Sequence, residues 1–417
     1  MQATTVQWAA AGIFGAALIH TFATKALERL AQRHPKHAGA LHLLGEVEVV
    51  FGLWAGVLIV TMALLSGGAA AIDYAESRRF AEPLFVFAVM VIAASAPVLA
   101  AVTSLMALLA RWLPLPAALA QVWLGLALVP LLGSLITEPA AMTLAALMLR
   151  GRVFTVGLPE WLKYVALGVL FVNVSIGGTL TSYAAPPVLM VAGAWQWDSG
   201  FMLHTFGWKA AIAVLVNATA VTWLLRRRIE PESVPSSAAP RVPGAIQLVH
   251  LAFLAGVVLF AHHPVVFLGL FLFFMGFTQA YERYQSPLIL KEGLLVGFFL
   301  AGLVVLGGMQ QWWLQPLVSS LGARALFFGA LGLTALTDNA ALTYLGSLIQ
   351  GIDAQAQYML VAGAVAGGGL TVIANPPNPA GVALLRRGFA DESIGAIGLL
   401  AGAALPTFVA AAAFLWL

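Results

Sequence analysis

The sequence has no cysteine among its 417 residues, and only 9% of them are Asp, Glu, Lys or Arg. Without cysteine the chain can form no disulfide, no thiol nucleophile and no cysteine-ligated metal site. A soluble protein carries roughly 25% charged residues. The shortage of charge, together with 61% hydrophobic residues and a mean hydropathy of +0.94, therefore excludes an ordinary soluble domain. The sequence also lacks a phosphate-binding loop, a nucleophile elbow and a zinc signature.

What the sequence has instead is long uncharged stretches. Four of them contain no Asp, Glu, Lys or Arg: Pro83–Ala110, Trp112–Thr137, Tyr164–Trp197 and Ser393–Leu417. About 20 apolar residues span a bilayer as a helix, whereas the strands of a membrane barrel alternate in short segments. We therefore predict an all-α polytopic membrane protein with about 10–12 hydrophobic segments. These are 6–24, 40–66, 84–108, 116–149, 160–182, 207–225, 245–261, 264–280, 288–308, 322–349, 356–374 and 393–416.

One polar stretch, Arg226–Gly244, is rich in proline and serine and interrupts the hydrophobic pattern. It is typical of a linker, and the three arginines at its start favour a cytoplasmic position. We expect a first membrane repeat at 1–226, a cytoplasmic linker at 227–243 and a second membrane repeat at 244–417.

The two halves contain paired motifs. "TEPAAMTL" (137–144) matches "TDNAALTY" (337–344) at four of eight positions, and "GGTLTSYAAPP" (177–187) matches "GGGLTVIANPP" (367–377) at seven of eleven. The pairs occur in the same order at offsets of 200 and 190 residues. This order indicates an internal duplication.

The acid motifs lie inside segments 116–149 and 322–349, which are too long or too interrupted for one straight span. We interpret each segment as a re-entrant hairpin with its acid, Glu138 or Asp338, at or near the tip. About five true crossings then remain in each half. An odd number makes the two repeats inverted, which is a recurring plan in secondary transporters.

The glycine motifs predict helices that are broken within the membrane. Gly177, Gly178, Gly367 and Gly368 loosen the helices, and the prolines that follow remove backbone donors. Irregular backbone at membrane depth is tolerated where it is buried in protein or lines a polar cavity. The freed carbonyls and nearby side-chain oxygens suit a hard cation such as Na⁺, while half-helix N-termini favour an anion. The simpler alternative is a kink that only assists packing.

The two acids indicate function more specifically than the glycine motifs do, because an ionised group in the bilayer is costly and marks a functional site by default. Burial raises the pKa of a carboxyl and a bound cation lowers it, so a carboxylate that holds either H⁺ or Na⁺ couples the two ions. An alternative for Glu138, which Pro139 follows, is that it caps a half-helix. The expected ion- and proton-binding residues are Asp338, Glu138, Asn339, Thr137, Thr337, Thr343, Thr143, Thr181, Ser182, Thr371, Asn375 and Asn378, with Na⁺ as the metal that they hold.

Glu46 and Glu48 are weaker candidates. They lie two residues apart, so they do not share a helix face, and we expect at least one of them to face water near the membrane edge. The histidines show no metal-binding spacing.

Three stretches, "LTDNAALTYLGSLI", "GGGLTVIANPPNPAG" and "GGTLTSYAAPPVLMVAGAWQWD", resemble a bacterial family of Na⁺/H⁺ antiporters. That family is similar to a branch of the ion transporter superfamily, whose members include divalent-anion/sodium symporters. The resemblance implies inverted repeats, each with a hairpin and a broken helix, and a homodimer with separate scaffold and transport parts. In the symporters, a Ser-Asn-Thr tip binds sodium and the carboxylate of the substrate. Those tips fall on 137–139 and 337–339, where acids would repel an anion and attract a cation.

We therefore predict a secondary active transporter, not an enzyme, that exchanges Na⁺ (or Li⁺ or K⁺) for H⁺ across the bacterial inner membrane by alternating access. It would need no cofactor, and its partners would be lipid and monovalent cations rather than nucleic acid. One alternative is a sodium-coupled symporter of a small organic anion. Another is a non-transporting membrane protein, such as an assembly factor or an intramembrane enzyme, although the sequence shows no catalytic constellation and the duplication around polar motifs argues against it.

Overall fold

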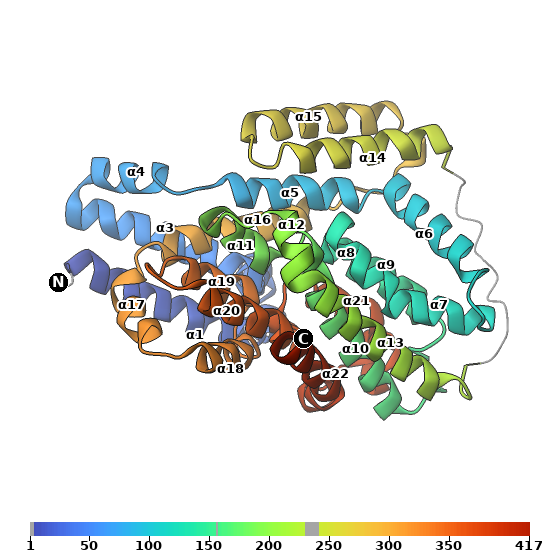
Figure 1. Cartoon of the computed structure of the whole chain (residues 1–417). Coiled ribbons are helices and arrows are strands. Elements are labelled where there is room, and N and C mark those ends of the chain that lie inside the picture. Colours follow the sequence, from blue (N-terminus) through green and yellow to red (C-terminus); the bar gives the residue numbers. More distant parts are fainter. Residues whose placement is uncertain (1–3, 156, 230–241) are drawn as a thin grey trace.

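The computed structural model describes residues 4–155, 157–229 and 242–417, and helices form most of this part of the chain (Figure 1). In the first half the α-helices are α1 (Thr5–Arg33), α2 (Ala38–Gly45), α3 (Val47–Ser66), α4 (Gly68–Glu76), α5 (Ala81–Ala93), α6 (Ala96–Ala110), α7 (Ala117–Leu126), α8 (Leu128–Ile136), α9 (Glu138–Arg150), α10 (Glu160–Gly177), α11 (Pro186–Trp195), α12 (Ser199–Met202) and α13 (Trp208–Leu225). In the second half they are α14 (Gly244–Leu259), α15 (Pro264–Ala280), α16 (Leu290–Gly307), α17 (Gln311–Ser319), α18 (Ala323–Thr334), α19 (Asn339–Ser347), α20 (Ala354–Gly367), α21 (Asn378–Leu385) and α22 (Ala396–Trp416). Short 3₁₀ turns η2 (Gly178–Leu180) and η5 (Val372–Ala374) follow α10 and α20.

Among the described residues, six helical segments are long and apolar enough to cross a membrane, and two bent helix pairs raise the number to eight. Four shorter apolar helices, α11, α14, α15 and α18, add to these. The prediction of an all-α polytopic membrane protein is confirmed. The prediction of a linker at 227–243 falls mainly on residues 230–241, which lie outside the described residues.

Two predicted segments differ from the structure in a physically informative way. Segment 84–108 is not one straight helix, because α5 and α6 meet at 63°, as in a broken span or a re-entrant loop. Ser95 and Pro97 stand at this junction, and the proline contributes no amide donor to the first turn of α6. Segment 116–149 contains three helices, since α7 bends by 44° into α8 before the hairpin of α8 and α9 begins.

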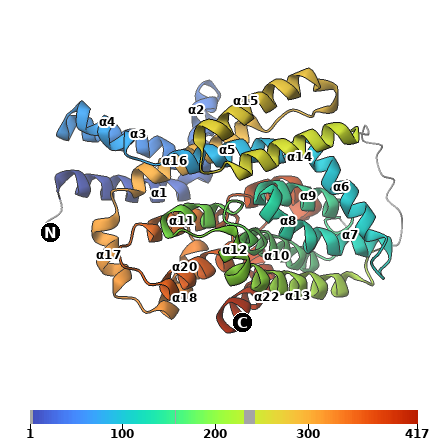
Figure 2. The same cartoon turned by 45° about the horizontal axis from the view of Figure 1, so that its top comes forward.

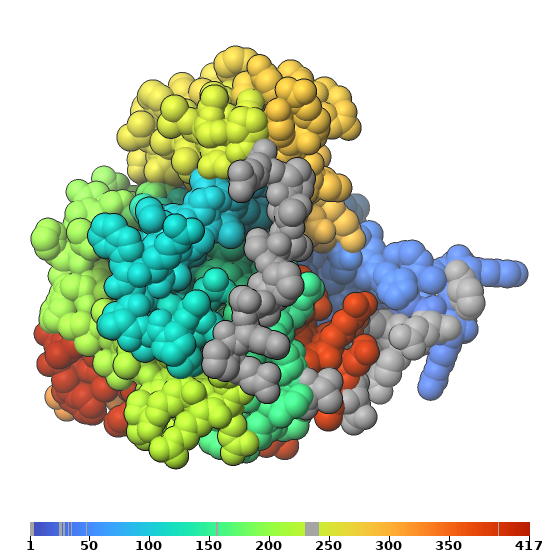
Figure 3. Space-filling model, turned by 90° about the vertical axis from the view of Figure 1, so that its right-hand side faces the viewer, coloured from blue at the N-terminus to red at the C-terminus, as the bar shows by residue number. Residues whose placement is uncertain are grey.

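The helices group into two parts. In one part α3 packs against α1 and α16, α16 packs against α5, and the α14–α15 hairpin covers α5 (Figure 2). We call this part, α1–α5 with α14–α16, the frame. The other part contains α7–α13 and α18–α22, and we call it the core part. The space-filling view shows α14 and α15 in yellow standing above the rest, with the blue N-terminal region projecting to one side (Figure 3).

The two repeats exchange partners inside the core part. Helix α11, which follows the break in the first half, packs against α19 of the second half, and α21 of the second half packs against α9 of the first. Two repeats related by a two-fold axis produce this arrangement. Each hairpin tip therefore meets the broken helix of the other repeat.

Candidate ion-binding site

The two acid motifs form the junctions between paired helices, as the sequence predicts. In the first half Thr137 separates α8 from α9, which begins at Glu138. Thr137 has a φ of 74°, in the left-handed region. A β-branched residue rarely adopts this conformation, and such strain, on the order of 1–3 kcal/mol, concentrates at functional sites. In the second half residues 335–338 separate α18 from α19.

Glu138 lies at the centre of a polar cluster that both repeats build. Its side chain is fully buried, and its Oε2 accepts a hydrogen bond of 2.8 Å from Asn375 Nδ2. Asn375 Oδ1 in turn accepts a hydrogen bond of 3.1 Å from Asn339 Nδ2. Asn375 precedes α21 and Asn339 begins α19, so three segments supply the cluster.

Several buried oxygens in and around this cluster have no hydrogen-bond partner. They are Glu138 Oε1, Thr137 Oγ1, Asn339 Oδ1 and Asn378 Oδ1, and each of these four residues is at most 2% exposed. Asn378 is held in place because its Nδ2 donates to the carbonyls of Gly368 (2.8 Å) and Thr371 (2.9 Å). Because buried polar atoms are usually paired, a set of unpaired oxygens is a candidate site for a hard cation, which prefers oxygen ligands.

The glycine pairs allow the broken helices to approach the tips. A Cβ on Gly178 would lie 2.5 Å from Glu138 Oε1, and one on Gly368 would lie 3.0 Å from Asn339 Nδ2. A side chain at either position would collide with the cluster. The two glycines play equivalent parts in the two repeats, which explains why the Gly-Gly motif occurs twice.

Asp338 is in a different situation from Glu138. It is the N-cap of α19, and its Oδ1 accepts hydrogen bonds from the backbone N–H groups of Ala340 (2.8 Å) and Ala341 (3.0 Å). Glu138 is the first residue of α9, so it stands where an acid favours a helix N-terminus, but no side chain makes an N-cap hydrogen bond in this helix. The twin acids of the duplication thus have different roles, because an N-cap accepts from the first-turn amides.

The threonines divide into two groups. Thr181 and Thr371 donate from their Oγ1 atoms to the carbonyls of Ser134 (2.7 Å) and Ala335 (2.9 Å), which ties each broken helix to the hairpin of its own repeat. The others donate within their own helical segments: Thr143 to Pro139 O, Thr337 to Leu333 O and Thr343 to Asn339 O. Hydrogen bonds therefore link Glu138, Asn375 and Asn339. Thr137 precedes Glu138, and Asn378 bonds the carbonyls of the broken helix. The hydroxyls of Thr143, Thr337 and Thr343 bond only within their own helical segments.

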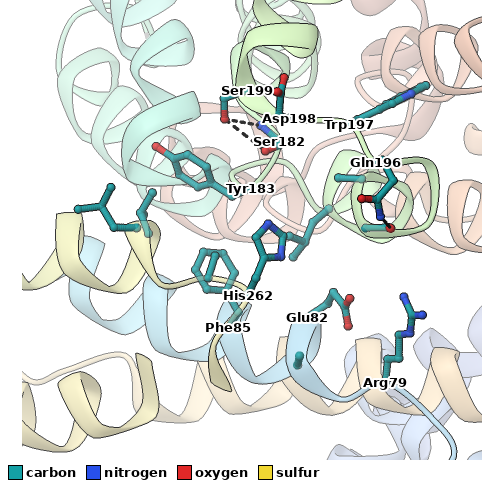
Figure 4. Close-up of a pocket in the computed structure, with 17 residues that line it drawn as sticks. Arg79, Glu82, Phe85, Ser182, Tyr183, Gln196, Trp197, Asp198, Ser199 and His262 are labelled. Atoms are coloured by element: carbon teal, nitrogen blue, oxygen red, sulfur yellow. Dashed lines mark hydrogen bonds between the residues drawn. The ribbon is translucent and has the colours of Figure 1, made fainter. Parts of the chain in front are cut away.

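Ser182 lies apart from the cluster, on the wall of an open cavity of about 680 Å³. Its Oγ is 3.2 Å from that of Ser199. Figure 4 shows Ser182, Tyr183 and Ser199 on one side of the cavity, and Arg79, Glu82 and Phe85 on the α5 side. We call this cavity the vestibule. Ser182 and Tyr183, which belong to the broken segment between η2 and α11, line it.

Two serines near the cluster, Ser175 and Ser134, are not predicted from the sequence, and Glu48, a weaker candidate, shares a cavity with Asn375. Ser175 Oγ donates to Val365 O (2.8 Å) and lies 3.5 Å from Asn339 Nδ2. Ser134 Oγ donates to Gly177 O (2.7 Å) and accepts from Leu180 N–H. Glu48 lines a cavity of about 40 Å³ together with Asp338 and Asn375. Ser134 precedes the acid motif by only three residues, but nothing in the sequence singles out Ser175.

Three comparisons relate the chain to known proteins. The profile of a family described as "Putative Na+/H+ antiporter" matches residues 5–417. Among solved structures, the chain is similar to the YdaH transporter from Alcanivorax borkumensis, whose crystal structure is described as revealing an unusual topology. That similarity has 16% sequence identity and a TM-score of 0.49, and it covers 88% of this chain and 96% of that one. A search of curated protein sequences finds no match.

Proposed function

This chain belongs to the Na⁺/H⁺ antiporter family whose profile spans it, and we propose that it exchanges Na⁺ (or Li⁺ or K⁺) for H⁺ across the bacterial inner membrane by alternating access. The observation that supports this proposal best is the environment of Glu138. The carboxylate is fully buried, one of its oxygens is held by Asn375, and the other has no partner.

The burial of Glu138 provides a physical reason for coupling. A bare carboxylate in a dry interior is costly, whereas a protonated acid or a carboxylate–cation pair is neutral. The site would therefore reorient readily only when Glu138 holds a proton or a cation. Competition of the two ions for one carboxylate then makes the movement of each depend on the other.

The cation would be held by Glu138 Oε1 with the unpaired oxygens of Thr137, Asn339 and Asn378. Carbonyl oxygens of the broken helices would complete the coordination shell of the cation, since carbonyls of unwound backbone coordinate Na⁺ in such transporters. Asp338 would supply a second acid at the opposite tip. Its contribution differs from that of Glu138, because Asp338 Oδ1 accepts from the backbone amides of its own helix α19, whereas Glu138 Oε2 accepts from Asn375 of the other repeat.

Alternating access would require the core part to move against the frame. The polar cluster lies within the core part, and the contacts between the two parts are made by α5, which packs against α8, α9 and α11, and by α16, which packs against α19. We also propose a homodimer, which the family resemblance implies and native mass spectrometry would test.

The exchange is tested in proteoliposomes that contain a pH-sensitive dye, in which addition of Na⁺ should drive H⁺ out of the acidified lumen. The wild type should respond, and Glu138→Gln should not, because a neutral amide can neither bind a proton nor neutralise a cation. Gln247, at the start of α14, offers a control in Gln247→Glu, which should respond normally. No response of the wild type to Na⁺, Li⁺ or K⁺ at any pH, or a full response of Glu138→Gln, would refute the proposal.

A second candidate function is sodium-coupled symport of a small organic anion. The volume of the vestibule favours it, because about 680 Å³ is within the range of small-molecule sites, and its wall carries Arg79 and His262 as well as the acids Glu82 and Asp198. Against it, the cluster at the repeat interface contains a carboxylate and no cationic side chain. Sodium-dependent, electrogenic uptake of a labelled dicarboxylate would support symport. Absence of such uptake would favour cation exchange.

A further inference from the structure

We propose that Glu48 transfers protons to and from Asp338, on a route that is separate from the route of the cation. This inference rests on the proposed Na⁺/H⁺ exchange. It assigns a function to a frame residue that lies outside both duplicated motifs.

Glu48 lines a cavity against the core part, whereas Glu46, two residues earlier, pairs with an exposed lysine. Glu46, at the junction of α2 and α3, forms an ion pair of 3.1 Å with Lys291, whose side chain is 69% exposed. Glu48, in the first turn of α3, lines the same cavity as Asp338 and Asn375. The charged groups around Glu48 are thus Glu46 and Lys291 on the outer side and Asp338 on the inner side.

The size of this cavity decides which species can pass through it. Its volume is about 40 Å³, and a cavity needs roughly 10–15 Å³ to hold a water molecule. A few waters fit, but a cation with a full hydration shell does not. Apart from the two acids and Asn375 the lining is apolar, including Val296, Phe299, Val372 and Ile373. Water between two carboxyl groups can relay a proton, whereas the apolar wall offers a cation no further ligands.

The inner end of the cavity is connected to the exchange site. Asn375 is 1% exposed, lines the cavity and donates to Glu138 Oε2, beyond which Glu138 Oε1 has no partner. Asp338 Oδ1 is held by two backbone amides, which leaves Oδ2 as the proton acceptor. In the transfer step the O–H bond of protonated Glu48 breaks, a water passes on the proton, and an O–H bond forms at Asp338 Oδ2, leaving Glu48 ionised. The reverse step releases a proton outward.

Two transport assays on the same proteoliposomes separate proton delivery from cation binding. Na⁺-driven H⁺ efflux needs both, whereas equilibrium exchange of ²²Na⁺ for unlabelled Na⁺ at fixed pH needs only the cation site and its reorientation. Glu48→Gln should slow Na⁺/H⁺ exchange about tenfold or more, as expected for loss of a proton-transfer group, and should leave ²²Na⁺/Na⁺ exchange within about twofold of wild type. Glu46→Gln is the matched control and should leave both rates unchanged.

A second variant tests the cavity without altering a carboxylate. Val296→Phe, on α16, should fill the space between Glu48 and Asp338 and reproduce the selective loss of Na⁺/H⁺ exchange. This variant also keeps the proposal testable if Glu48→Gln does not fold. Normal Na⁺/H⁺ exchange in Glu48→Gln, or an equal loss of both activities in the two variants, would overturn the inference. If the wild type performs neither reaction, the proposed function itself fails.

Discussion

Asn375 donates a hydrogen bond of 2.8 Å to Glu138, although the two residues are 237 positions apart and belong to different repeats. The bond orients one oxygen of a buried carboxylate and leaves the other free for an ion. In the first repeat, the position equivalent to Asn375 is Ala185, so the duplicated motifs are not functionally symmetric.

Asn375→Ala tests this bond directly. A hydrogen bond to a charged group contributes about 1.5–3 kcal/mol, so we expect the Na⁺/H⁺ exchange rate to fall by at least about tenfold. Initial rates in proteoliposomes measure the effect. Asn217→Ala, which alters a buried amide elsewhere in the core part, controls for the general loss of a buried polar group, and an equal loss in both variants would contradict a specific role for Asn375.

Gly178→Ala should abolish exchange, because the added Cβ would lie 2.5 Å from Glu138 Oε1 and 2.8 Å from its Cγ. The carboxylate would have to leave its position in the cluster. Gly276→Ala, on α15, has nothing within 4 Å of the added atom and should exchange normally. Retention of wild-type exchange by Gly178→Ala would show that Glu138 need not contact the broken helix.

The two functions of Asp338 can be separated by two substitutions. Asparagine is a good N-cap but carries no charge, so Asp338→Asn should fold like the wild type and exchange more slowly. Asp338→Ala removes the cap as well and should lose about 1 kcal/mol of stability. Thermal unfolding in detergent, combined with exchange rates, distinguishes the two effects. Equal melting temperatures of both variants would argue against a capping role.

The threonines should behave in two groups. Thr181→Val and Thr371→Val break the bonds that tie the broken helices to Ser134 and Ala335, and each leaves a carbonyl without its partner, at a cost of about 1–3 kcal/mol. We expect slower exchange in both. Thr143→Val and Thr343→Val lose only bonds to carbonyls within their own helices and should remain close to wild type. The four exchange rates form the test, and a strong defect in Thr143→Val would indicate a direct ligand role.

Lys163 offers a prediction about stability alone. It is 1% exposed, and its Nζ donates to Gly388 O (2.6 Å) and lies 2.6 Å from Glu160 Oε1. Lys163→Met should destabilise the protein by about 1–3 kcal/mol and lower its melting temperature. Exchange per folded molecule should stay normal, because Lys163 and Gly177 are separated along α10 by about 20 Å. Glu160→Gln, which alters the half-exposed partner of Lys163, should lower the melting temperature less than Lys163→Met does.

Much of the architecture can be predicted from the sequence because its signals are local. Long runs without charge require helices in a membrane, and Gly-Gly with Pro-Pro cannot continue a regular helix, so the breaks after Gly177 and Gly367 follow from composition. The two acid motifs mark the helix junctions at Thr137 and Asp338 because the surrounding segments are too long for one span. The identities shared by the paired motifs predict an internal repeat in which a hairpin and a broken helix occur twice.

The relations between the motifs were decided by the tertiary structure. Asn375 reaches Glu138 because α21 packs on α9 of the other repeat, and no pattern in either motif encodes that exchange of partners. Similar acids acquire different roles because Asp338 caps α19 while Glu138 is turned into the interface. Glu48 meets Asp338 only because the frame and the core part share a cavity. Local sequence specifies where a helix must break, whereas the packing of distant helices specifies what the broken ends face.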